Sequence, residues 1–91
     1  MYLEIVSPEA SLVSGNVESV TVPSVEGEFQ MLNNHAAIVA ILVKGKVKFK
    51  GDATIADGQE KNFTKEDGQW VMQINSGTVE MKDNNVIVLV D

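Results

Sequence analysis

Lys46-Val47-Lys48-Phe49-Lys50 alternates a lysine with an apolar residue at every step. Successive side chains of an extended chain point to opposite faces, so the two apolar residues lie together on one face and the lysines on the other. The segment therefore predicts a strand that is buried on one face and solvated on the other. Residues 19–22 alternate in the same way, and Pro23 ends that run because proline cannot donate a hydrogen bond to a sheet.

Two other segments are apolar on both faces. Residues 86–90 are rich in β-branched side chains, which predicts a strand covered on two sides. Residues 36–43 are the one segment that could also form a helix. Half of their side chains are β-branched, so we predict a second buried strand there.

Turn-forming residues separate these segments at short, regular intervals. They are Ser14-Gly15-Asn16, Lys44-Gly45, Gly51-Asp52, Asp57-Gly58, Asp67-Gly68 and Lys82-Asp83-Asn84-Asn85. Glycine and asparagine tolerate the positive φ angles of tight turns, and short connections of this kind join antiparallel strands. The sequence therefore predicts one all-β domain over residues 1–91, a sandwich or a barrel of nine or ten strands.

Composition excludes several classes of function. The net charge is −6 and all seven basic residues are lysine, so the bidentate guanidinium that recognises nucleic acid is missing. With no cysteine, neither a disulfide framework nor a thiolate metal site is possible. We find no signal peptide, and the longest apolar run, residues 36–43, is too short to span a bilayer. We therefore expect a soluble chain that does not insert into a membrane.

The sequence offers little chemistry. His35 is the only histidine, so we expect it to cap a turn or to lie in an interface rather than to act as a general base. No phosphate-binding loop, calcium loop or serine-nucleophile motif is present, and we predict no catalytic residue, no metal and no cofactor. The lysines at positions 44, 46, 48 and 50 could meet an acidic partner, but a solvated strand face is the simpler interpretation.

Residues 26–36 form the most unusual segment, because three polar residues separate a short apolar cluster from the strand that follows. If Phe29 and Met31 point outward, they are candidate anchors of a protein interface. If they point inward, they belong to the core. Periodicity leaves both possibilities open.

Several short blocks occur in a fixed order along nearly the whole chain. They are Leu3-x-Ile5-Val6-Ser7-Pro8-Glu9, Ser14-Gly15-x-Val17, Val20-x-Val22-Pro23, Glu26-Gly27-Glu28-Phe29, Asn34-His35-Ala36, Gly77-x-Val79-Glu80-Met81 and Asn84-x-Val86-x-Val88-Leu89-Val90-Asp91. Together they resemble the N-terminal domain of the epsilon subunit of bacterial F-type, proton-translocating ATP synthases.

The resemblance implies a flattened antiparallel β-sandwich of about ten strands. It also implies a place in the central stalk, between the gamma subunit and the membrane-embedded c ring. The positions that match the family's side towards the c ring are Glu28, Phe29, Gln30 and Met31. The positions that match its gamma-facing side are Ser7, His35 and Ala40.

The chain departs from the family at several positions. Gln30 stands where the family usually has glycine and Ala37 where it usually has proline, so we expect a different loop geometry before the buried strand predicted at residues 36–43. Asn75-Ser76-Gly77-Thr78 replaces the usual Ser-Gly-Gly-Phe in the last hairpin. The sequence ends at Asp91, where most members continue into two helices associated with ATP binding and with inhibition of hydrolysis. We therefore expect neither property here.

These observations lead to one hypothesis and one rival. The hypothesis is a non-catalytic coupling subunit of an ATP synthase, held peripherally at the cytoplasmic face of a bacterial inner membrane. The rival is a free-standing β-sandwich module that binds a small ligand or carbohydrate. That rival needs a concave pocket, for example a cleft beside Trp70, although the segment around Trp70 is more simply explained as core.

Overall fold

The computed structural model describes every residue from Met1 to Asp91. Ten strands form in the order β1 (Tyr2–Val6), β2 (Ser11–Ser24), β3 (Gly27–Leu32), β4 (Ile38–Leu42), β5 (Gly45–Gly51), β6 (Thr54–Ile55), β7 (Phe63–Glu66), β8 (Gln69–Ile74), β9 (Gly77–Lys82) and β10 (Asn85–Val90). The only helix is the short 3-10 turn η1 (Glu60–Asn62), so no helix has the length needed to cross a bilayer.

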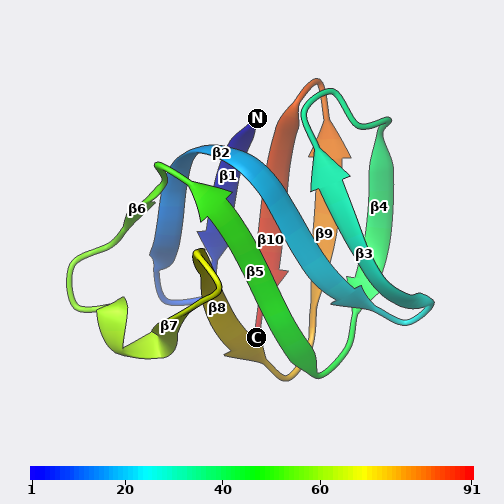
Figure 1. Cartoon of the computed structure of the whole chain (residues 1–91). Helices are drawn as coiled ribbons and strands as arrows, with labels where there is room; N and C mark the ends of the chain where they lie inside the picture. Colours follow the sequence, from blue (N-terminus) through cyan, green and yellow to red (C-terminus); the bar gives the residue numbers. More distant parts are fainter.

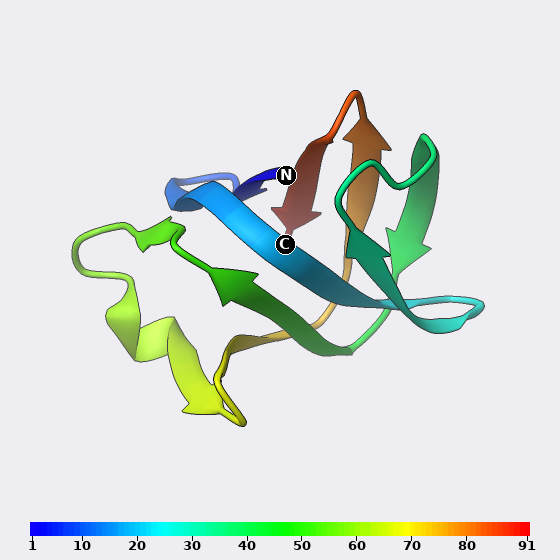
Figure 2. The same cartoon turned by 45° about the horizontal axis from the view of Figure 1, so that its top comes forward.

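Strand β2 is long and belongs to two layers. Residues 11–16 pair with β1 and β6, whereas residues 17–24 pair with β3 and β5. Figures 1 and 2 show β2 arching from the rear layer into the front one. The turn predicted at Ser14-Gly15-Asn16 is therefore wrong: these residues form a bend inside one continuous strand.

The bend brings two backbones unusually close together. Gly51, at the end of β5, has a φ of 144°, and a Cβ atom there would lie 2.5 Å from the Cα atom of Val17. Gly15 has a φ of 142°, and its Cβ would lie 2.7 Å from the Cα atom of Ala53. Only glycine combines this backbone conformation with the absence of a side chain, so both residues are needed where β2 changes layer.

The two layers share β2 and enclose one core. The front layer has the order β3-β2-β5-β8-β7, and the rear layer has the order β4-β9-β10-β1 with the start of β2 and β6 beside it. The predicted ten-stranded β-sandwich is confirmed. Every pairing is antiparallel except that of β1 with β10, which is parallel because the first and last strands run side by side in the same direction (Figure 1).

The core fills the space between the layers. Val47 and Phe49 of β5 have no exposed surface, which confirms the half-buried strand predicted from the alternating lysines. The Phe49 ring packs edge-on against Phe63 of β7, with ring centroids 6.1 Å apart. Trp70 of β8 is half-buried and packs against the same cluster.

The prediction that residues 36–43 and 86–90 are covered on both faces is wrong. Val39 and Ile41 of β4 are 74% and 62% exposed, and Leu89 of β10 is 46% exposed. The inward side chains of these strands contact the core, but no layer covers the outside of the rear sheet. Apolar side chains are thus left facing solvent on this surface.

Candidate docking surfaces

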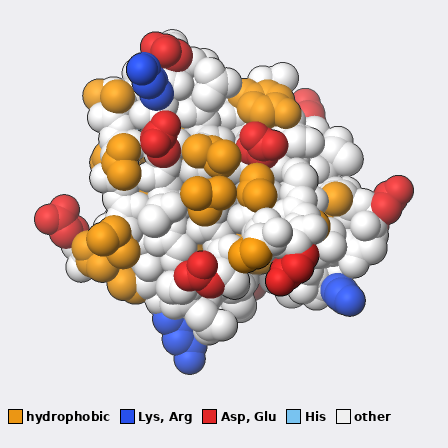
Figure 3. All heavy atoms as spheres, turned by 180° about the vertical axis from the view of Figure 1, so that it is seen from behind, with side chains coloured by type: hydrophobic (Ala, Val, Ile, Leu, Met, Phe, Trp, Pro, Cys, Tyr) orange, Lys and Arg blue, Asp and Glu red, His pale blue; other side chains and the backbone are white.

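The outside of the rear layer carries an apolar face, which we define as Val6, Val25, Val39, Ile41, Ile87 and Leu89. Strand pairing places Leu89 of β10 beside Val6 of β1, and both lie in line with Ile41 across Thr78 of β9. Val25 joins the edge of this face because its backbone N–H donates to the carbonyl oxygen of Ile41 at 3.1 Å. Figure 3 shows orange side chains gathered on this side of the molecule. Exposed apolar clusters of this kind mark docking sites in soluble proteins.

The residues predicted to face the gamma subunit lie around this apolar face. Ser7 directly follows Val6 in the turn from β1 to β2, where its hydroxyl hydrogen-bonds with Ala10. His35 lies in the loop before β4, with its Nδ1 atom 2.8 Å from the carbonyl oxygen of Ala36. Ala40 lies within β4 and turns its side chain towards the core. The structure thus puts Ser7 and His35 at the β1 and β4 sides of the rear layer, with the apolar face between them.

The residues predicted to contact the c ring lie on β3, an edge strand of the front layer. Glu28 and Gln30 are exposed and point away from the core, whereas Phe29 is partly buried against it. Met31 is 0% exposed. Its side chain fills the core, so the interpretation of Met31 as an interface residue is wrong for this folded chain. Side chains alternate along the strand, and Phe29 and Met31 take the inward positions.

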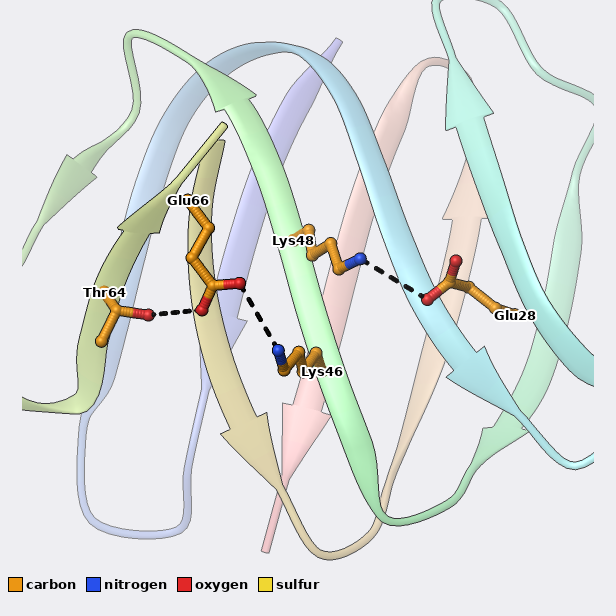
Figure 4. Close-up of polar contacts among 5 residues, drawn as sticks. All are labelled: Glu28, Lys46, Lys48, Thr64 and Glu66. Atoms are coloured by element: carbon orange, nitrogen blue, oxygen red, sulfur yellow. Dashed lines mark hydrogen bonds and ion pairs between the residues drawn. The ribbon is translucent and has the colours of Figure 1, made fainter. Parts of the chain in front are cut away.

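The front layer has a polar outer face. Lys46 and Lys48 point outward from β5, and their Nζ atoms lie 3.4 Å from Glu66 and 3.9 Å from Glu28 (Figure 4). Thr64 donates a hydrogen bond to the same Glu66 carboxylate at 3.2 Å. These pairs are solvent-exposed, so each contributes at most about 1 kcal/mol to stability. The two layers therefore present opposite chemistries to their surroundings, one polar and one apolar.

A groove of about 530 Å³ runs between the β2–β3 hairpin and β4. Glu28 and Phe29 contribute to one wall, and His35 and Ala40 contribute to the other. The groove is thus the one place where residues from the two predicted contact sets meet. Ser7 lies outside it, in a different turn.

The structure contains no cluster of metal-ligating side chains. The chain has no group of three or more His, Asp or Glu side chains placed to hold an ion. Trp70 lines none of the surface hollows, and the Lys65 ammonium lies 4.7 Å above its ring. The cleft that a carbohydrate-binding module would need beside Trp70 is therefore not formed.

Sequence reasoning missed four residues of the apolar face because it assigned their two segments, residues 36–43 and 86–90, to the interior. These residues are Val39, Ile41, Ile87 and Leu89. The available signal was that residues 36–43 and 86–90 are apolar at successive positions. In a chain of only 91 residues, two such strands exceed what two thin layers can cover from both sides. The alternative explanation for these two apolar runs was that a partner protein covers the outer face of the strands.

Comparison with known proteins gives a consistent result. The family model described as "ATP synthase, Delta/Epsilon chain, beta-sandwich domain" matches residues 1–91. The "ATP synthase epsilon chain" of Campylobacter curvus is 33% identical over 91 residues, which cover all of this chain and 60% of that protein. The chain of the same name from Chlorobium limicola is 34% identical over 89 residues, covering 98% of this chain and 86% of that protein.

Two further similarities concern a shorter segment and the fold. The "ATP synthase epsilon chain" of Aquifex aeolicus is 52% identical over 50 residues, which cover 55% of this chain and 38% of that protein. A chain in the structure titled "Cryo-EM structure of Tetrahymena thermophila mitochondrial ATP synthase - central stalk/cring" superposes with a TM-score of 0.71 at 15% identity, covering 98% of this chain and 61% of the other. The chain thus spans about 60% of the length of several relatives that it matches.

Proposed function

Because the chain belongs to the family of the ATP synthase delta/epsilon chain beta-sandwich domain, we propose that it is a non-catalytic subunit of the central stalk. In this role it joins the gamma subunit to the c ring and transmits rotation between them. The observation that carries the proposal is the apolar face on the outside of the rear layer. A subunit that works by being held between other proteins needs such a surface and needs no reactive group.

The apolar face is the surface that docks on gamma. Its side chains come from three strands, β1, β4 and β10, and from Val25 in the β2–β3 turn, so a partner that covers it is held mainly against a sheet. Ser7 and His35 border this surface, which agrees with the gamma contacts implied by the family. Ala40 supports it from beneath, because its side chain packs into the core between Val39 and Ile41. A stable interface of this kind buries on the order of 1,000 Å² or more.

The c ring is contacted through β3 and the hairpin that leads into it. Glu28 and Gln30 present polar side chains on the opposite layer from the apolar face, and Phe29 adds a partly exposed ring beside the groove. The two partners therefore occupy different sides of the sandwich. Such a placement holds the subunit peripherally at the cytoplasmic face of a bacterial inner membrane. Nothing in this arrangement requires a nucleotide.

The proposal is tested by mixing the purified chain with the gamma subunit of the same organism and separating the mixture by size. Co-elution is expected at micromolar concentration, with a Kd of about 1 µM or lower. Separate elution of the two proteins at that concentration would show that the stalk assignment is wrong.

Glu28→Lys tests the second surface independently of the first. We expect binding of the chain–gamma complex to detergent-solubilised c ring to weaken by about tenfold, because the change reverses a charge in the contact strand. Glu66→Lys is the matched control, since it makes the same charge change on the same layer and also loses an exposed ion pair with a lysine of β5. Binding to gamma should stay within about twofold for both variants. Equal effects of both variants on ring binding would argue against a contact through β3.

A further inference from the structure

We infer that the partner of the apolar face carries two basic side chains that meet Glu80 of β9 and Glu4 of β1. Docking then depends on charge as well as on apolar contact. This inference rests on the proposed function, because it concerns the same docking of the gamma subunit.

The register of the rear strands places both carboxylates among the apolar residues. Val39 of β4 pairs with Glu80, and Glu80 pairs with Ile87 of β10. Ile87 in turn pairs with Glu4. Apolar and acidic side chains thus alternate across four neighbouring strands, and Figure 3 shows red carboxylates between the orange side chains.

Neither carboxylate has a cationic partner within the chain. Both ion pairs of the structure belong to the front layer. Lys82 is the only basic side chain that points outward from the four rear strands, and it forms no ion pair with Glu80, two residues before it. In the free chain, water solvates Glu80 and the half-buried Glu4.

A partner that covers the apolar face removes this water. Burying a carboxylate under an apolar surface without a cation costs more free energy than the burial of one valine or isoleucine side chain provides. Glu80 lies between Val39 and Ile87, so a partner cannot cover both of these side chains and leave Glu80 in solvent. A partner that binds here must therefore supply cations at the positions of the two carboxylates.

The distance between the two carboxylates predicts the spacing of the basic side chains on the partner. Glu80 and Glu4 lie two strands apart, which corresponds to about 10 Å between their backbones. The complementary surface is apolar, with two lysine or arginine side chains at about that separation. The net charge of −6 favours a basic partner in the same way. A second copy of this chain fits less well, because it would bring the same carboxylates and offer only Lys82 to pair with them.

The test measures the Kd for the gamma subunit by calorimetry at two salt concentrations. At low salt, Glu80→Lys and Glu4→Lys are each expected to weaken binding by about 30-fold, and Glu80→Gln by about tenfold. The affinity of the unaltered chain should fall as salt is raised, because ions screen the charge pairs. The salt dependence of the Glu80→Gln variant should be smaller, since one pair is gone.

Glu60→Lys is the control, because it makes the same charge change in η1, an exposed turn between β6 and β7. Its Kd should stay within about threefold of that of the unaltered chain. If the unaltered chain does not bind gamma, the proposed function itself is wrong. If it binds and Glu80→Lys binds as tightly as Glu60→Lys, the function stands and this inference is wrong. Sedimentation of the chain alone as a dimer that Glu80→Lys disrupts would also overturn it, in favour of a second copy as the occupant.

Discussion

Ile41→Asp is expected to weaken binding to the gamma subunit by at least about 100-fold, which corresponds to about 2.7 kcal/mol. Ile41 is 62% exposed and lies in the apolar face, in line with Leu89 and Val6. Docking would bury the new carboxylate against apolar partner atoms with no cation assigned to it. Isothermal titration calorimetry against purified gamma measures the change directly.

Leu32→Asp is the matched control for this prediction. Leu32 is 54% exposed, so it resembles Ile41 in chemistry and accessibility, but it lies on β3 in the front layer. Its Kd for gamma should stay within about twofold of that of the unaltered chain. Melting curves should show that both variants fold, because neither residue contributes to the core. Equal losses of affinity in both variants would mean that the apolar face is not the docking surface.

Local periodicity was sufficient to predict some of the strands and the inner face of β5. The alternating lysines predicted that Val47 and Phe49 are buried, and both are. This inference works because the direction of a side chain in a strand depends only on its position in the chain. The same principle explains why Glu28 and Gln30 face outward while Met31 faces inward, once the strand containing them is known.

What lies outside a sheet could not be predicted from periodicity. An apolar strand such as β4 has the same sequence whether its second face is covered by the chain itself or by a partner. The sequence also could not show that apolar and acidic side chains alternate across the rear layer. This row forms only after four strands have paired in one register, and it consists of Val39, Glu80, Ile87 and Glu4. Residues that are distant in sequence then form one surface, and no local pattern contains that information.

Gly51→Ala is expected to destabilise the fold strongly, with a loss of about 3–5 kcal/mol of the free energy of unfolding. The new Cβ atom would lie 2.5 Å from the Cα atom of Val17 and 3.0 Å from the carbonyl oxygen of Asn16. Both neighbours are backbone atoms, so no side chain can rotate away to make room. For a domain of this size the loss is a large part of a total stability of about 5–14 kcal/mol. The melting temperature should fall by roughly 15–30 °C, as measured by circular dichroism.

The Gly58→Ala variant distinguishes the steric clash of a new Cβ atom from the cost of a positive φ angle. Gly58 also has a positive φ, 84°, but a Cβ atom there would meet nothing within 4 Å. It should therefore lose only about 1 kcal/mol, the cost of the left-handed backbone alone. Similar losses for the two variants would mean that the close approach at the bend is not what limits residue 51. If the larger loss at Gly51 is observed, the crossing of β2 between the two layers depends on this glycine. Since that crossing joins the two layers, the placement of the apolar face and the polar face on opposite sides of the sandwich depends on it as well.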